Sequence, residues 1–192
     1  MSAQQSRQST QRGLSREEIL DATLALAEEQ SLDAVSMREV ARRLGVTPMA
    51  LYHHVGDKQG LLDALVERLL AELPIPDPQL PWKERLRALA TSLRATARRH
   101  PDAFLMLFQR PASTPDALER RDAVCAALRD AGVPEAIVPR AERLLSTFVL
   151  GFAASEAGGR FGRRTKAQLD DDLTWLEETI LSLAELRGLP SR

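Results

Sequence analysis

An all-α protein with two domains is the architecture that this sequence predicts. Apolar residues recur at helical spacing along most of the 192 residues, and residues typical of helix ends frame these runs. The prolines at positions 74, 76, 78 and 81 interrupt the pattern and indicate a boundary between a small N-terminal domain and a larger C-terminal one. With 44% hydrophobic residues, the chain can build a sizeable core.

The N-terminus is expected to be a disordered arm followed by a helix. Residues 1–13 are rich in Ser, Gln and Arg and carry no apolar run, so they read neither as a secretory signal nor as part of a core. Ser15 and Glu18 have the spacing of a capping box, which starts a helix that should fade near Gln30.

Two short helices should come next, joined by a tight turn. Ser36 and Glu39 give a second capping box for the first of them, and Gly45 can supply the left-handed residue that ends it. Thr47 is a suitable N-cap for a helix over 48–55, where a proline in the first position loses no hydrogen bond.

The rest of the chain is predicted to be helical on both sides of the prolines. Asp57 caps a connecting helix over 57–73, which joins an N-terminal domain at 14–56 to a C-terminal domain at 82–192. Within the C-terminal domain, helices are expected over 82–99, 101–109, 114–131, 135–157 and 166–187, which makes about nine in the chain.

Charge and cysteine content exclude several classes of protein. The 26 basic and 27 acidic side chains nearly cancel, so the chain is not a polycation. A single cysteine, Cys125, can form no internal disulfide and is typical of a reducing compartment, so we expect a cytoplasmic protein. The uncharged stretch over 144–155 is shorter than the ~20 residues that span a bilayer, so no membrane partner is expected.

The two short helices have the arrangement of a helix-turn-helix unit, in which the second helix reads DNA. Leu51 and Val55 lie on the face of that helix that must pack inward, while Met49, Tyr52 and His53 share another face. An exposed methionine, tyrosine and histidine suit the major groove of DNA. The alternative is a three-helix bundle whose exposed aromatic side chains face the rest of the protein.

Residues 35–62 resemble the DNA-binding segment of the TetR family of transcriptional regulators. The resemblance is strongest to the tetracycline-repressor branch, because the second short helix ends in Leu51-Tyr52-His53-His54-Val55 and Lys58 follows three residues later. The resemblance implies a regulator that binds a palindromic double-stranded DNA operator as a homodimer. It also implies a repressor that a ligand releases from the operator.

The resemblance also assigns roles to single residues. Arg38 would reach a base edge or a phosphate, because its guanidinium group can donate two hydrogen bonds to guanine at once. The positions that match phosphate contacts are Thr47, Tyr52, His54 and Lys58, and those that match base contacts are Pro48, Met49, Ala50 and His53. Two alternatives stay open: Lys58 as an ordinary surface lysine, and His54 as a buried core residue.

The C-terminal helices are expected to supply a dimer interface. Apolar rows recur over 135–157 and 166–187, and members of the family dimerise through such a helix pair. The expected interface residues are Leu145, Phe148, Val149, Phe152, Leu176 and Leu183. The same rows could instead be core.

The helices between are expected to enclose an effector pocket, as the resemblance implies. Its candidate residues are Leu89, Leu93, Phe104, Met106 and Phe148. The alternative is that these apolar side chains belong to the ordinary core, as rows of aromatic and methionine residues more often do. Met106 stands where the tetracycline-repressor branch has a metal-coordinating histidine. We therefore expect a small apolar effector and no metal.

No feature of the sequence indicates an enzyme or a cofactor. No His-Glu-x-x-His spacing occurs, Cys125 has no histidine near it, and the glycines at 158–162 follow no strand. The competing hypothesis is an all-helical ligand-binding or interaction protein that does not bind DNA.

Overall fold

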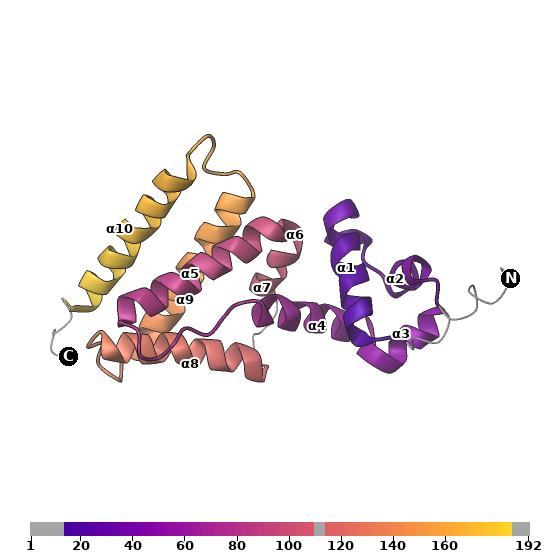
Figure 1. Cartoon of the computed structure of the whole chain (residues 1–192), viewed down its shortest axis with the longest axis horizontal. Coiled ribbons are helices and arrows are strands. Elements are labelled where there is room, and N and C mark those ends of the chain that lie inside the picture. Colours follow the sequence, from indigo (N-terminus) through magenta and orange to yellow (C-terminus); the bar gives the residue numbers. More distant parts are fainter. Residues whose placement is uncertain (1–13, 110–113, 186–192) are drawn as a thin grey trace, which may run out of the picture. The chain divides into compact units, whose positions relative to one another are not determined.

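The computed structural model describes residues 14–109 and 114–185, and within these ranges all regular secondary structure is helical (Figure 1). The all-α class predicted from the sequence is therefore confirmed. The chain divides into two compact units, one ending at Arg68 and the other beginning at Leu69. The predicted arm at 1–13 lies outside the described residues.

The N-terminal unit contains the predicted helices and one short element that was not predicted. Its elements are α1 (Arg16–Gln30), the 3-10 helix η2 (Leu32–Ala34), α2 (Met37–Leu44), α3 (Pro48–Val55) and the first part of α4 (Lys58–Ala71). Ser31 precedes η2 with a φ of 83°, and Gly45 ends α2 in the left-handed region with a φ of 68°. The predicted boundaries hold to within about two residues.

The two predicted capping boxes differ in how completely they form. Ser15 Oγ accepts from the Glu18 amide at 3.1 Å, and Glu18 Oε2 accepts from the Ser15 amide at 2.9 Å, so the first box is complete. Ser36 Oγ accepts from the Glu39 amide at 3.2 Å, but the Glu39 carboxylate accepts from Arg42 instead. The second prediction was therefore half right, because a nearby cation competes for the acid.

A close approach of backbones joins the end of α3 to the start of α4. Asp57 Oδ1 accepts from the Gly60 amide at 2.9 Å, as expected for an N-cap. A Cβ atom at Gly60 would lie 2.2 Å from the carbonyl oxygen of Val55, a distance that no side chain can tolerate. Glycine is therefore required at position 60 for this packing of α3 against α4.

Apolar side chains from α1, α2, α3 and the first part of α4 are buried in the N-terminal unit. The fully buried large members of this core are Ile19, Leu26, Val35, Val40, Leu51, Leu61 and Leu65. Leu51 and Val55 on one face of α3 pack into this core, and the opposite face of α3 points outward.

The C-terminal unit is built from the remaining helices. They are α5 (Trp82–Arg99), α6 (Pro101–Phe104), α7 (Met106–Gln109), α8 (Pro115–Asp130), α9 (Val138–Ala157) and α10 (Lys166–Glu185). Two expectations need correction. The helix predicted over 101–109 is interrupted at Leu105, and α9 begins at Val138 rather than at 135, because the residues before it form a turn.

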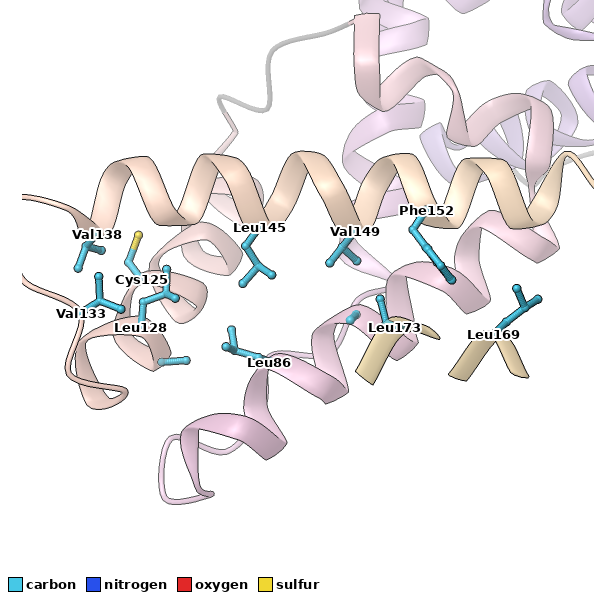
Figure 2. Packing of buried hydrophobic residues seen from close by; sticks show 12 residues of the cluster. Leu86, Cys125, Leu128, Val133, Val138, Leu145, Val149, Phe152, Leu169 and Leu173 are labelled. Atoms are coloured by element: carbon cyan, nitrogen blue, oxygen red, sulfur yellow. The ribbon is translucent and has the colours of Figure 1, made fainter. Parts of the chain in front are cut away.

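Helix α9 packs against α5, α8 and α10 with one of its sides (Figure 2). One side of α9 carries Val138, Leu145, Val149 and Phe152, which project toward the other helices. They pack with Leu86 of α5, Cys125 and Leu128 of α8, and Leu169 and Leu173 of α10. This core holds α5, α8 and α10 around α9.

A buried ion network adds to the packing of three of these helices. Arg94 of α5 donates from Nε to Glu156 of α9 at 2.6 Å and from Nη1 to Asp170 of α10 at 2.7 Å. The side chains of Arg94 and Glu156 are only 3% and 6% exposed. The guanidinium also lies 5.4 Å from the centroid of the Phe152 ring. One cation therefore joins α5, α9 and α10.

Candidate nucleic-acid interface

The outward face of α3 carries large side chains that are exposed among the described residues. Met49 is 66% exposed and Tyr52 is 47% exposed, whereas Leu51 and Val55 of the same helix are 0% and 7% exposed. Burial therefore separates the two faces as the spacing predicted. A methionine and a tyrosine so exposed on one short helix indicate a contact surface.

The structure brings the predicted DNA-binding residues together on α2, α3 and the start of α4. The exposed ones are Arg38, Thr47, Pro48, Met49, Tyr52, His53, His54 and Lys58, and Ala50 is half-buried. His54 is exposed, so the alternative that it belongs to the core is wrong. All nine positions lie within the N-terminal unit.

The basic residues of this surface fall into two groups. Arg43 donates to Glu29 through both Nη atoms, at 2.7 and 2.6 Å, and Arg42 pairs with Glu39. Arg38 forms no ion pair with any residue that the structure describes, and the same is true of Lys58. The second group is thus available to an anionic partner.

Electrostatics keep the first group neutralised. Hydrogen bonds from Arg43 lower the pKa of the Glu29 carboxyl, and hydrogen bonds from Arg42 lower the pKa of the Glu39 carboxyl. Both acids therefore stay ionised at neutral pH beside their arginines. Sequence spacing could not predict the pair of Glu29 and Arg43, because the two residues come from different helices.

The first turn of α3 has an unused hydroxyl group. Thr47 occupies the N-cap position, but its side chain makes no capping hydrogen bond. Its hydroxyl can therefore donate to a phosphate oxygen, which a capping hydroxyl engaged with the backbone does less readily. This geometry suits the phosphate role expected for Thr47.

A second candidate site is an apolar cavity of about 210 Å³ in the C-terminal unit. Leucines dominate its wall, including Leu89 and Leu93, which the sequence had nominated. The full lining is Leu70, Leu73, Leu86, Leu89, Ala90, Leu93, Ala117, Arg120, Arg121, Val124, Glu142, Leu145, Ser146, Val149 and Leu150. The sequence had not nominated any of the polar members.

The other three nominated pocket residues lie elsewhere. Phe104 is fully buried with Ala97 and Ala153 in a separate small cluster. Met106 is 1% exposed and does not line the cavity. Phe148 belongs to α9 and packs, partly buried, against the main core, where its ring centroid lies 6.2 Å from that of Phe152. The helix on which the sequence had placed Phe104 and Met106 is interrupted between them, at Leu105.

The residues predicted to form a dimer interface are mostly core. Leu145, Val149 and Phe152 are at most 9% exposed and face the other helices of the same chain. Phe148 is half-buried, and the side chains of Leu176 and Leu183 lie outside the described residues. Among the described side chains of these helices, the large apolar ones that are exposed are Leu144 on α9, 57% exposed, and Trp175 on α10, 67% exposed.

The described residues contain no group of three histidine, cysteine or acidic side chains placed to hold a metal ion. Cys125 is buried, and burial followed by the charge of Glu142 raises the pKa of its thiol, so it is a weak nucleophile. None of the described helices is long and apolar enough to cross a membrane.

Comparison with known proteins identifies the family. Residues 19–65 match the model for bacterial regulatory proteins of the tetR family, and residues 75–183 match that for a tetracyclin repressor-like C-terminal domain. The chain therefore belongs to the tetR family of bacterial regulatory proteins, which is the resemblance expected from residues 35–62.

Relatives and solved structures agree with this assignment. An HTH-type transcriptional regulator of Saccharopolyspora erythraea is 32% identical over 75% of this chain, and the repressor DrrR1 of Streptomyces coeruleorubidus is 30% identical over 74%. The matches span only 61% and 54% of those two relatives. The crystal structure of Mycobacterium smegmatis BioQ is 26% identical, with a TM-score of 0.77 over 91% of this chain and 100% of that one.

Proposed function

We propose that this chain is a homodimeric transcriptional repressor that binds a palindromic DNA operator and is released from it by a small molecule. The observation that carries the proposal is the outward face of α3, where Met49 and Tyr52 are exposed. Arg38 of α2 and Lys58 of α4 are exposed as well and form no ion pair with any residue that the structure describes. A solved structure of BioQ, 28% identical, is described as a complex with its double-stranded DNA operator.

In this proposal the nine surface residues divide between backbone and bases. The phosphates are held by Thr47, Tyr52, His54 and Lys58, which fixes the register of α3 on the duplex. The side chains of Pro48, Met49, Ala50 and His53 face base edges, where an apolar atom can contact a thymine methyl group. Arg38 offers a bidentate fork to guanine or to a phosphate.

A homodimer supplies the second reading helix. Two such helices lie about 34–36 Å apart when they enter successive major grooves, so the operator repeats its half-site with that spacing. Leu144 of α9 and Trp175 of α10 support a dimer surface on these helices, because both are large, apolar and exposed. The names of the relatives, which are regulators and repressors, support regulation rather than catalysis.

The cavity of the C-terminal unit is the proposed effector site. Part of its wall comes from Leu70, in the last turn of α4, and α4 begins directly after the reading helix α3. A ligand releases DNA only if it binds more tightly to a conformation that fits the operator poorly. We propose that ligand binding in the cavity releases DNA through a movement of the end of α4.

Selection of bound DNA from a random duplex pool, at a stated salt concentration, tests the proposal. We expect an enriched palindrome, and the Arg38→Ala variant should enrich it poorly or not at all. If the wild-type protein enriches no sequence and binds random duplex DNA no better than albumin at low salt, the chain is instead a ligand-binding or interaction protein of the same fold.

A further inference from the structure

We propose that the effector is a mostly apolar molecule with a protonated amine, and that Glu142 binds this amine in the cavity of the C-terminal unit. The inference rests on the proposed function, because it names the ligand class of the same regulatory cavity. Four features of the wall support it: the burial of Glu142, its unused acceptor capacity, the occupied state of Arg120, and the apolar remainder.

Glu142 is a buried carboxylate in a wall of leucines. The residue is 8% exposed, and Leu86, Leu89 and Leu145 are among its neighbours in the lining. An ionised carboxylate in such surroundings is costly unless hydrogen bonds and a countercharge compensate it. The partners of Glu142 therefore decide what else it can bind.

The chain's own partners leave part of this carboxylate unsatisfied. Ser146 Oγ donates to Glu142 Oε1 at 3.0 Å, and Arg121 Nε lies 3.3 Å from Oε2. A carboxylate can accept about four hydrogen bonds, so each oxygen has room for a further donor. Arg121 is 49% exposed, and water weakens its attraction to Glu142. A cation inside the cavity would complete the compensation.

The second arginine of the wall is held by backbone carbonyl groups. Arg120 donates from Nε to the Leu73 carbonyl at 2.9 Å, from Nη1 to the Asp116 carbonyl at 2.8 Å and from Nη2 to the Ala71 carbonyl at 3.2 Å. Three of its five N–H groups are thus engaged, and two remain. An anion would have to use these two groups or Arg121, and Glu142 in the same wall would repel it.

Ser146 contributes to the same selectivity. Its single hydroxyl hydrogen points to Glu142, so the oxygen can only accept from a ligand. Glu142 and Ser146 therefore both present acceptors to the cavity, and a ligand amine can donate to both residues. The volume of about 210 Å³ and the leucine lining suit a body of one or two fused rings.

Three ligands that differ in one group test this inference on the full chain: 2-(aminomethyl)naphthalene, 2-naphthalenemethanol and 2-naphthoate. Calorimetry at pH 7 measures their dissociation constants. We expect the amine to bind about tenfold more tightly than the alcohol, and the acid to bind most weakly. The matched variants are Glu142→Gln, which removes the charge and keeps the shape, and Glu119→Gln, which changes a carboxylate of α8 outside the cavity wall.

In Glu142→Gln the advantage of the amine over the alcohol should fall to about twofold or less, while Glu119→Gln keeps the wild-type order. Circular dichroism and the unfolding midpoint establish that both variants fold. The proposal is overturned if the alcohol or the acid binds the wild type as tightly as the amine, if the amine keeps its advantage in Glu142→Gln, or if none of the three binds.

The failure of this inference and that of the proposed function are separable. Ligand binding is measured without DNA, so an amine preference that depends on Glu142 stands even if no operator is found. Conversely, if the wild type selects an operator from which none of the three ligands releases it, that result supports DNA binding and excludes only the amine as the effector.

Discussion

The reading surface and the effector cavity are built in opposite ways. The nine residues of the surface come from positions 38–58. All of them except the half-buried Ala50 are exposed, so they are available to contact DNA. The cavity draws its wall from α5, α8, α9 and the end of α4, and its one carboxylate is buried. Local spacing therefore determines the first site, while the second depends on packing between distant segments.

The ion pairs of the two units show the same contrast. In the N-terminal unit, Arg43 and Glu29 are 33% and 54% exposed at their side chains. In the C-terminal unit, Arg94 and Glu156 are 3% and 6% exposed. An exposed pair is screened by water, whereas removal of one member of a buried pair strands the other. Substitutions should therefore have very different consequences in the two units.

The largest effect is expected for Arg94→Ala, which breaks the buried network. Glu156 would keep only Arg98, at 3.2 Å, and Asp170 would lose its link to α5. Loss of one partner of a buried pair costs ~3–5 kcal/mol. We expect urea unfolding to show that the unfolding free energy falls by this amount. Arg94→Lys keeps the charge but cannot reach both acids, so its unfolding free energy should lie between those of the wild type and Arg94→Ala. An unfolding midpoint equal to that of the wild type in either variant would contradict the role assigned to Arg94.

The next effect concerns assembly through the C-terminal unit. An arginine in place of Trp175 puts a charge on a large exposed apolar side chain, so it should weaken a dimer about 100-fold and leave the monomer folded. Phe152→Arg is the matched variant, because Phe152 is 9% exposed in the core and its replacement should cause misfolding. Sedimentation and circular dichroism separate the two outcomes. A dimeric Trp175→Arg protein would place the interface elsewhere.

Gly60→Ala tests how closely the reading helix depends on its support. The added Cβ would meet the Val55 carbonyl at 2.2 Å, so the end of α3 must move. We expect a loss of ~1–3 kcal/mol in unfolding free energy and a larger loss of operator affinity. Gly151→Ala in α9 is the control, since its Cβ meets nothing within 4 Å and alanine favours a helix. Equal behaviour of the two variants would remove the argument for Gly60.

Much of the fold could be predicted from the sequence, because its helix ends carry local signals. Ser15, Gly45 and Asp57 act within a few residues of their own positions, and the helices they start or end were predicted correctly. The second capping box was only half formed, since Glu39 has a choice between two nearby partners. A spacing rule identifies a possible bond but does not rank it against competitors.

The cavity was harder to predict, for a physical reason. Periodicity shows that a residue faces inward, but it does not distinguish a wall with space beside it from a filled core. Phe104 fills a packed cluster and Leu93 lines the cavity, although both belong to apolar faces. The hydrogen bond from Arg94 to Asp170 joins residues that are 76 positions apart in the sequence. Such contacts follow from tertiary packing alone.

Lys58→Ala should have a smaller, uniform effect on the reading surface. If Lys58 meets a phosphate, its loss lowers affinity for operator and random DNA alike, by about tenfold, and reduces the salt slope by about one. Met49→Ala, in contrast, should change the preferred base with little change in the salt slope. Fluorescence anisotropy at several salt concentrations measures both. An unchanged slope in Lys58→Ala would exclude the phosphate role.

The smallest effect is expected for Arg43→Ala, which breaks an exposed pair near the reading surface. Arg43 is bonded to Glu29, so it should contribute little to DNA binding, whereas Arg38→Ala should weaken it clearly. The hydrogen bond from Arg43 lowers the pKa of Glu29 below its ordinary value of 4.5. A lowered carboxyl pKa stabilises the folded state above the unfolded value and loses that contribution as the pH falls through the folded value.

The stability difference between wild type and Arg43→Ala should therefore be small at pH 7 and vanish in acid, once Glu29 is protonated in both folded proteins. Added salt should reduce it as well, because the pair is exposed. Urea unfolding at pH 7 and in acid, with and without salt, measures the difference. A gap that persists in acid would mean that Arg43 stabilises the N-terminal unit through the packing of its methylene groups rather than through its charge.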